Sequence, residues 1–208
     1  MKIAVNARWL LPGKLEGTGV YTLRMLEQII PAFPQHEFHL LLDRQVDTGQ
    51  LGLDFPNLSY HVVSPPARHP WLWAMWNDWA VPQKLKRLNV DLYWSPDGLP
   101  AKTNIRQWVT IHDLNFEHHP QWVPAPVAKY YSKNIKRGAE LADKVFTVSH
   151  WSKNDLRTTY GLPEDKISVT YNAPQRKFSP GTSSNEGAYF CAVGALTPRK
   201  NLKTLLLA

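Results

Sequence analysis

The sequence places a histidine and an aspartate side by side, directly after a short apolar run. Residues 108–111, Trp-Val-Thr-Ile, are typical of a buried strand, and His112 and Asp113 follow them. In an open parallel sheet, ligands bind beyond the carboxyl ends of the strands. There His112 can donate or accept a proton near neutral pH, and Asp113 can cap the next turn or fix the imidazole tautomer. The pattern predicts a reactive pair; a strand-end histidine and a turn aspartate without a catalytic role are the alternative.

A second candidate site is the segment Gly17-Thr18-Gly19, which lies between a predicted first strand and a predicted helix. Strand, glycine loop and helix, in this order, present backbone N–H groups and the positive end of a helix dipole to an anion. The glycines would let the backbone approach such a ligand closely. A bare tight turn is the alternative, because the third glycine of the dinucleotide-binding fingerprint is missing.

These residues need elements to position them, and apolar runs alternate with amphipathic stretches along most of the chain. Strands that alternate with helices are typical of a doubly wound sheet. Ser149 and Gly161 are the expected caps of one of the helices. We therefore predict an α/β fold with a Rossmann-like, doubly wound parallel sheet. Strands are expected at 2–7, 38–42, 58–63, 91–94, 108–111, 144–148 and 166–171, helices at 20–30, 70–88, 127–141 and 150–160, and a loop at 115–126.

The composition bounds the class of protein. The chain has 208 residues, enough for one complete domain or for one domain and part of another, and its formal net charge is +7. A basic balance suits anionic partners such as nucleotides, phosphates, anionic lipid or nucleic acid. The single cysteine excludes an intrachain disulfide and fits a reducing compartment. Met1 leads directly into the first strand, so we expect no signal peptide and a cytoplasmic location.

Four tryptophans, at positions 71, 73, 76 and 79, lie in the predicted helix 70–88, whose end carries Lys84, Lys86 and Arg87. Pro82 should kink or break this helix. A basic helix that is rich in tryptophan can lie in a membrane interface. The alternative, which we favour, is a helix that packs against the sheet and has a solvated basic end.

The composition changes after residue 173. Residues 174–187 are rich in Pro, Ser and Gly and show no hydrophobic period, which is typical of a linker. A new strand is expected at 189–193, followed by a turn and the start of a helix. One strand and one helical turn cannot bury a core. We therefore predict a domain at 1–173, a linker at 174–187 and the first part of a second domain at 188–208, and we expect the chain to be a fragment.

Five stretches, taken in order, resemble the retaining GT-B glycosyltransferases of family four, in particular bacterial mannosyltransferases. The resemblance covers nearly the whole chain. It implies the amino-terminal, acceptor-side half of a GT-B fold, followed by the start of the donor-binding domain. The stretches are residues 17–21 (GTGVY), 91–96 (DLYWSP), 109–114 (VTIHDL), 148–156 (VSHWSKNDL) and 193–201 (VGALTPRKN).

The resemblance also implies roles for single residues. The Gly17–Gly19 loop would lie against the diphosphate of the donor. His112 would stand beside the donor sugar, with Asp113 as its catalytic neighbour. Arg199 and Lys200 would neutralise the leaving diphosphate, because fixed cations stabilise the charge that forms there; a solvated basic turn is the alternative. No metal and no other cofactor would then be required.

The first functional hypothesis is therefore retaining transfer of a sugar from a nucleotide-sugar donor to a glycan or lipid-linked acceptor, at the inner face of the membrane. The subgroup favours mannose and GDP-mannose. The chain departs from the family at Val20 and Ala195, where many members have arginine, and it lacks the paired glutamates of the second domain, so we expect it to be inactive alone. The alternative is a non-catalytic domain that binds a nucleotide, a glycan or a membrane surface. Nucleic-acid binding is disfavoured because no recognised motif is present.

Overall fold

The computed structural model describes residues 1–175, 178 and 190–207, and its centre is one parallel sheet. Seven strands lie in the order β3-β2-β1-β4-β5-β6-β7, and all neighbouring pairs are parallel. The order runs outward in both directions from β1 and β4, so the sheet is doubly wound and the predicted fold class is confirmed. The strands are β1 (Lys2–Asn6), β2 (Glu37–Leu42), β3 (Leu58–Val62), β4 (Leu92–Ser95), β5 (Arg106–Thr110), β6 (Lys144–Thr147) and β7 (Ile167–Val169).

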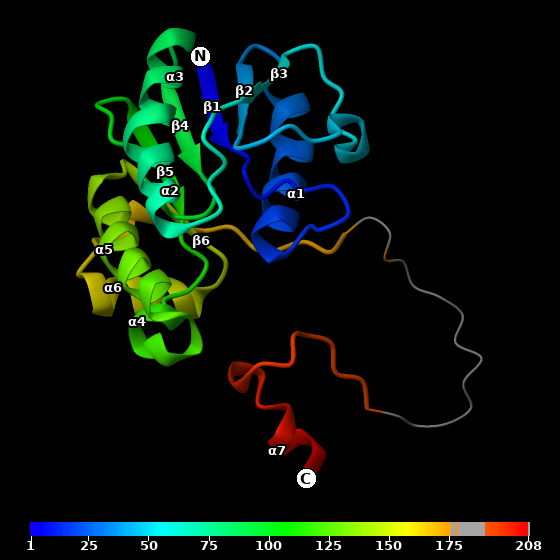
Figure 1. The fold of residues 1–208 in the computed structure, drawn as a ribbon, viewed down its shortest axis with the longest axis vertical. Coiled ribbons are helices and arrows are strands. Elements are labelled where there is room, and N and C mark those ends of the chain that lie inside the picture. Colours follow the sequence, from blue (N-terminus) through cyan, green and yellow to red (C-terminus); the bar gives the residue numbers. More distant parts are fainter. Residues whose placement is uncertain (176–177, 179–189, 208) are drawn as a thin grey trace.

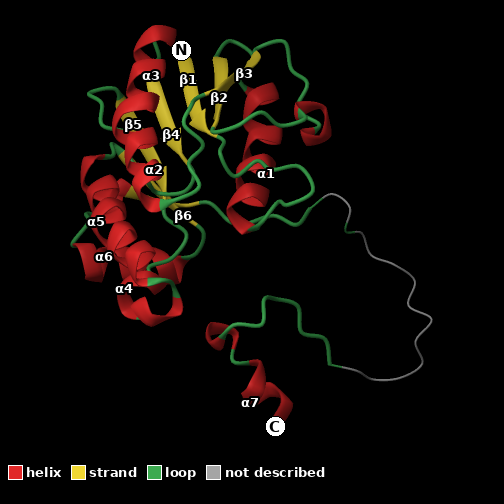
Figure 2. Ribbon diagram, viewed as in Figure 1, coloured by secondary structure: helices red, strands yellow, loops and turns green. Residues whose placement is uncertain are grey.

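Helices lie on both faces of this sheet (Figures 1 and 2). Successive residues of a strand point to opposite faces, so Leu40 packs under α1 while Leu41 packs under α2 and α3. Both leucines are fully buried, which explains why the strands read as continuous apolar runs. The helices are α1 (Gly17–Ala32), α2 (Pro70–Met75), α3 (Val81–Leu88), α4 (Asn115–His118), α5 (Ala125–Leu141), α6 (His150–Tyr160) and α7 (Leu202–Leu207), with the short turns η1 (Thr48–Leu51), η2 (Trp76–Ala80), η3 (Pro120–Trp122), η4 (Glu164–Lys166) and η5 (Pro198–Lys200).

The helix predicted at 70–88 is continuous, but a π-helical turn, η2, separates α2 from α3. The N–H of Val81 bonds to the carbonyl of Trp76, five residues back. Proline lacks an N–H, and its ring needs room at the carbonyl four residues before it. The interruption expected at Pro82 is therefore a widened turn directly before the proline.

The tryptophans of this segment divide between the core and the surface. Trp73 and Trp76 are buried, and the indole N–H of Trp76 donates to the carbonyl of Val63 at 2.8 Å. Trp71 and Trp79 remain 59% and 58% exposed. The segment thus contributes to the core, as favoured from the sequence, and still presents two indole rings to solvent.

Three predictions differ clearly from the structure. The helix expected at 20–30 begins at Gly17 and continues through Pro31 to Ala32, because a proline in the last turn removes only one hydrogen bond. The loop expected at 115–126 contains α4 and η3, held by the buried ring of Phe116. Residues 190–193 form no strand, since no neighbouring strand pairs with them in the described part of the chain. Most of the linker predicted at 174–187, and residue 189, lie outside the described residues.

A pair of histidines at the edge of the sheet should make stability depend on pH. Nδ1 of His39 lies 3.1 Å from Nε2 of His61. One proton can be shared between these two nitrogens, but two charged rings at this distance would repel each other. Burial, with Lys84 nearby, lowers the pKa of His61 to about 4, and burial also lowers the pKa of His39. Because the unfolded chain binds protons first, stability should be complete above pH 6.5 and fall as the pH drops toward 4. Urea unfolding at several pH values measures this.

The variant His61→Gln should flatten that dependence, because it removes one of the two titrating rings. His150→Gln, at an exposed position on α6, is the matched control and should leave the slope unchanged. Equal slopes in all three proteins would contradict the assignment.

Candidate functional site

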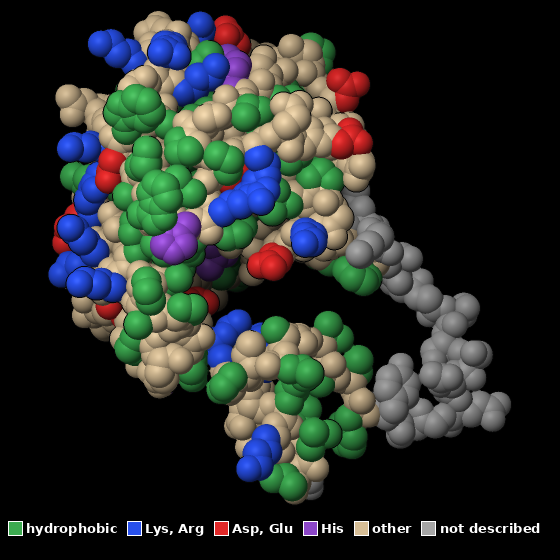
Figure 3. Space-filling model, viewed as in Figure 1, with side chains coloured by type: hydrophobic (Ala, Val, Ile, Leu, Met, Phe, Trp, Pro, Cys, Tyr) green, Lys and Arg blue, Asp and Glu red, His purple; other side chains and the backbone are tan. Residues whose placement is uncertain are grey.

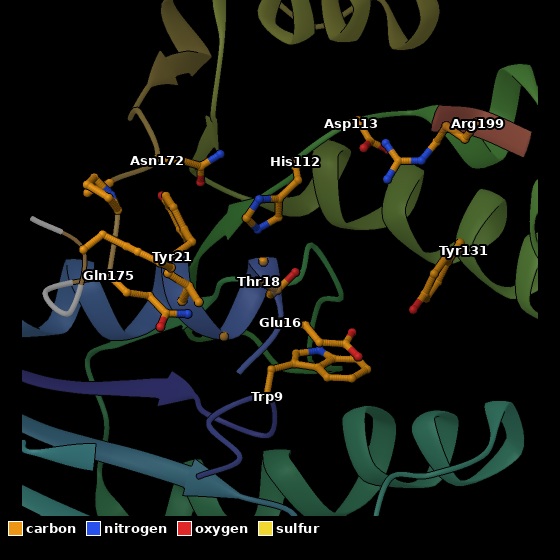
Figure 4. A pocket seen from close by; sticks show the side chains of 16 residues that line it. Trp9, Glu16, Thr18, Tyr21, His112, Asp113, Tyr131, Asn172, Gln175 and Arg199 are labelled. Atoms are coloured by element: carbon orange, nitrogen blue, oxygen red, sulfur yellow. The ribbon is translucent and has the colours of Figure 1, made fainter. Parts of the chain in front are cut away.

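A cleft of about 650 Å³ opens beyond the carboxyl ends of the strands, near β1 and β4, where the strand order reverses (Figure 4). Ligands of open α/β sheets bind at this position. The walls come from segments far apart in the sequence: the loop after β1, the start of α1, the residues after β5, helix α5, the chain after β7 and the turn η5. They include Trp9, Glu16, Gly17, Thr18, Gly19, Tyr21, His112, Asp113, Tyr131, Asn172, Gln175 and Arg199.

The glycine segment forms the first turn of α1 rather than a loop before it. Val20 makes the first helical bond, from its N–H to the carbonyl of Glu16 at 2.8 Å, and Glu16 gives no side-chain cap. The N–H groups of the first helical turn have no intrahelical partner by geometry. Gly17, Thr18 and Gly19 all line the cleft, so the open, positive end of α1 is available to an anion there.

The two glycines differ in their surroundings. A Cβ on Gly19 would lie 2.5 Å from the carbonyl oxygen of Trp9 and 3.1 Å from Leu15, whereas a Cβ on Gly17 meets nothing within 4 Å. Gly19 therefore lets α1 approach the loop after β1, and Gly17 leaves the helix end open.

Gly19→Ala should consequently destabilise the fold by about 1–3 kcal/mol, because the methyl group must displace backbone rather than a flexible side chain. Chemical unfolding of both alanine variants checks the prediction. Gly17→Ala is the control and should be neutral or slightly stabilising. Equal stability of the two variants would show that the contact with Trp9 is not restrictive.

His112 lies two residues beyond β5, which ends at Thr110 and not at residue 111 as predicted. Its Nε2–H donates to the carbonyl of Pro96 at 2.9 Å, and its ring stands edge-on to Tyr21, with 5.0 Å between the centroids. Ser152 on α6 donates to the backbone carbonyl of His112 at 3.1 Å. Three segments thus hold this residue at the cleft.

Burial lowers the pKa of His112, although the bond to Pro96 and the charges of Asp113 and Asp97 oppose that shift. The ring is therefore neutral near pH 7. Because a carbonyl only accepts, the Pro96 bond assigns the proton to Nε2 and leaves a lone pair on Nδ1. No group among the described residues bonds to Nδ1, so it is free to accept a hydrogen bond from a ligand hydroxyl.

Asp113 caps the next turn, because its Oδ1 accepts from the N–H of Asn115 at 3.1 Å. The tautomer of His112 is set by the Pro96 carbonyl, not by this aspartate. Figure 4 shows Arg199 beside Asp113, and both line the cleft. Lys200 is not part of the lining and packs near Gly194. The structure thus places six of the seven predicted site residues at one cleft.

Sequence reasoning missed a buried ion pair behind the cleft. Nε of Arg8, in the loop after β1, donates to Oδ2 of Asp97, after β4, at 2.6 Å, and the two side chains are 2% and 7% exposed. Trp9 donates its indole N–H to the same oxygen at 3.1 Å. The other oxygen accepts from Asn6 and Ser95 at 3.0 and 2.8 Å. One carboxylate therefore joins the two loops at the switch point.

The charges of this pair support each other. Burial raises the pKa of Asp97, but the guanidinium of Arg8 and hydrogen bonds from Ser95 and Leu99 outweigh it and leave that pKa below its ordinary value. The terminal nitrogens of Arg8 have no hydrogen-bond partner among the described residues. Its guanidinium lies over the rings of Trp9 and Trp73, 5.0 and 5.3 Å from their centroids. Asp97 is two residues beyond a strand-end serine, the same kind of position that singled out His112.

Tyr21 is a second residue that sequence reasoning missed as a site residue. Its hydroxyl lies 2.7 Å from Oγ1 of Thr170, directly after β7, and its ring touches His112. The side chain thus connects α1 to the far side of the cleft. Among the residues that the structure describes, no group of three His, Cys, Asp or Glu side chains is arranged to hold a metal ion.

Comparison with known proteins gives relatives that match much of this chain. The sequence is 28% identical over 160 residues to the O-antigen chain mannosyltransferase RfbU of Salmonella typhimurium strain LT2, covering 76% of this chain and 44% of RfbU. It is 25% identical over 129 residues to O-antigen chain mannosyltransferase B of Escherichia coli, covering 56% of this chain and 34% of that protein. The chain therefore spans less than half the length of these relatives.

Solved structures share the fold at low sequence identity. The apo form of the lipopolysaccharide outer core galactosyltransferase WaaB superimposes with a TM-score of 0.53 and 14% identity, over 89% of this chain and 50% of WaaB. A UDP-N-acetylglucosamine 2-epimerase superimposes with a TM-score of 0.55 and 12% identity, over 82% and 48% of the two chains.

The family assignment rests on a match to the family as a whole rather than to single relatives. Residues 16–173, which include the helix end, His112 and the Asp97 carboxylate, match Glycosyltransferase Family 4. That range covers more than half of the chain and agrees with the doubly wound sheet and the position of the cleft. The chain belongs to glycosyltransferase family 4, and it corresponds to the amino-terminal part of a GT-B-type member of that family.

Proposed function

We propose that this chain is the acceptor-side half of a retaining glycosyltransferase, which moves mannose from GDP-mannose to a glycan or lipid-linked acceptor without a metal. The observation that carries the proposal is the meeting of two groups in one cleft: the open amino-terminal end of α1 and the free Nδ1 of His112. The helix end suits the diphosphate of the donor. A neutral imidazole suits the hydroxyls of its sugar.

Departure of the nucleoside diphosphate leaves negative charge on the phosphate. Positive groups that are fixed in place stabilise such charge without reorganisation. The first turn of α1 supplies backbone N–H groups, and Arg199 supplies a cation at the same cleft. Lys200 is assigned a supporting role in the same turn, η5. Because the chain spans 44% of RfbU, we propose turnover for a protein that also has the remaining length, and donor binding for this chain.

Titration of the chain with GDP-mannose in the presence of EDTA tests donor binding and metal independence together. The informative variant is Gly17→Pro. Proline fits the first helical position, the preceding Glu16 is extended as proline requires, and one backbone N–H is removed. Gly17→Ala keeps that N–H and is the matched control.

Affinity for GDP-mannose should be about tenfold lower in Gly17→Pro than in Gly17→Ala, the effect of one hydrogen bond to a charged group. Equal affinity in both variants would rule out the helix end as the phosphate site. Tighter binding of UDP-glucose than of GDP-mannose would contradict the proposed donor but would still support the helix end as the phosphate site.

Our second proposal is that one surface of the chain contacts the inner leaflet of the membrane. The exposed rings of Trp71 and Trp79 lie on the α2–η2 segment, and Trp79 lines a groove with Lys84 and Arg87. Figure 3 shows hydrophobic side chains over this part of the molecule with Lys and Arg along their flank. Trp73 and Trp76 are buried and take no part. None of the described helices is long and apolar enough to cross a membrane.

Sedimentation with vesicles tests this contact. Each basic residue near an anionic surface contributes roughly 1 kcal/mol, so binding to phosphatidylserine-rich vesicles should be weak and lost at high salt. Replacing Lys84, Lys86 and Arg87 by Gln, or Trp71 and Trp79 by Ser, should reduce it. Trp151→Ser, which changes an indole on α6 that is 69% exposed, is the control. Binding that survives the three Gln substitutions would refute the proposal.

A further inference from the structure

A second pocket of about 270 Å³ adjoins the cleft and shares Asp113, Tyr131 and Arg199 with it. One of its other walls comes from residues 115–123, the segment for which the sequence predicted a loop. Another comes from the turn before Arg199, with Ala195, Thr197 and Pro198. Figure 4 shows Asp113 and Tyr131 on the side of the cleft away from Tyr21 and Gln175. A ligand in this pocket would therefore lie next to a ligand bound at the start of α1, with Asp113 between the two.

Four of the side chains that line this pocket are aromatic. Phe116, His119, Trp122 and Tyr131 all line it. The His119 ring stacks on the Trp122 indole with 4.0 Å between centroids, and Tyr131 stacks on the buried Trp73 with its ring planes 11° apart. These contacts fix the orientations of the Trp122 and Tyr131 rings before any ligand arrives, which lowers the entropic cost of binding.

We propose that this aromatic pocket binds a neutral pyranose ring of the acceptor glycan; the inference rests on the function proposed above. One face of a pyranose is formed by C–H groups and packs on an aromatic surface, while its rim of hydroxyls needs polar partners. Ligand sites of this kind combine apolar walls with a few placed polar groups.

The polar groups of the pocket match such a rim. Asp113 uses Oδ1 to cap the turn at Asn115, and its Oδ2 remains an acceptor for a hydroxyl. The side chain of Asn115 and the hydroxyl of Tyr131 add donors and acceptors. Of the described residues that line the pocket, only Arg199 carries a fixed positive charge, and Asp113 offsets it. A neutral ligand therefore fits the pocket better than a phosphate.

Saturation-transfer difference NMR on the whole 208-residue chain tests the inference, with methyl α-mannopyranoside as the probe. Trp122→Ala removes the aromatic wall, and Trp122→Phe keeps a smaller one. Trp151→Ala, at an exposed position on α6, is the control. Far-UV circular dichroism and thermal unfolding establish that each variant is folded, and GDP binding is measured on the same samples.

Saturation of the sugar C–H protons should fall at least fivefold in Trp122→Ala, fall less in Trp122→Phe and stay unchanged in Trp151→Ala, with GDP binding constant throughout. Sugar signals that persist in Trp122→Ala overturn the inference, and so does the absence of sugar signals from the unaltered chain. In either case, GDP binding on the same samples would still support the donor site. Loss of guanine signals in Trp122→Ala would mean that the pocket holds the nucleobase, which also overturns it. Absence of GDP binding with intact sugar binding would count against the proposed function alone.

Discussion

Asp97→Ala is expected to lower the free energy of unfolding by about 3–5 kcal/mol, because it leaves the buried guanidinium of Arg8 without its counter-charge. The two side chains are 2% and 7% exposed, and the terminal nitrogens of Arg8 already have no hydrogen-bond partner in the part of the chain that the structure describes. The same change removes the acceptor for Trp9 and Asn6. Urea unfolding of the chain measures the loss.

Asp78→Ala is the matched control, since Asp78 pairs with Arg137 at 3.1 Å where the side chains are 38% and 30% exposed. Breaking this surface pair should cost less than about 1 kcal/mol. Adding Arg8→Met to Asp97→Ala should restore part of the stability, because it removes the uncompensated charge. A cost for Asp97→Ala as small as that for Asp78→Ala would show that water reaches the Arg8 guanidinium.

The second large effect concerns His112. In a protein that carries this chain together with the remaining length of its relatives, His112→Ala should lower turnover about 100-fold, the effect of removing one preorganised polar group from the reacting centre. Steady-state kinetics with the donor and acceptor sugars measure it. The structure adds that the ring packs against Tyr21, so some loss of stability is expected in the alanine variant.

His112→Gln separates catalysis from packing, since its amide can still donate to the Pro96 carbonyl but offers no Nδ1 lone pair. Its stability should stay close to that of the unaltered protein while its turnover falls. Turnover should also decline as the pH drops below the lowered pKa of His112, because a protonated Nδ1 no longer accepts a hydrogen bond. Normal turnover in both variants would leave His112 a structural strand-end residue.

The local pattern predicted most of the elements. Apolar runs with intervening amphipathic stretches located all seven strands of the sheet, and Ser149 and Gly161 bound α6 as expected: the Ser149 side chain accepts from the N–H of Ser152, and Gly161 has φ +67°. These features depend on residues within one or two turns of each other, which is why they are readable along the chain. The position of His112 beyond β5 followed from the same reasoning.

Boundaries were less predictable where tertiary packing outweighs local preference. The segment 115–126 folds into α4 and η3 because Phe116 is buried against Tyr131 of α5, with 5.7 Å between their ring centroids. Polar and proline residues around it suggested a loop. This segment forms one wall of the aromatic pocket beside the cleft, so the pocket could not be predicted from the sequence.

The sequence by itself determined the alternation of strands and helices, the parallel sheet, and the places where polar residues follow strands. Tertiary structure decided which of those residues meet. Arg8 and Asp97 are 89 positions apart, Tyr21 and Thr170 are 149 apart, and α2 with η2 buries two tryptophans and exposes two others. Such contacts depend on strand order and on the face that each helix covers. A local period specifies the type of an element but does not specify its neighbours.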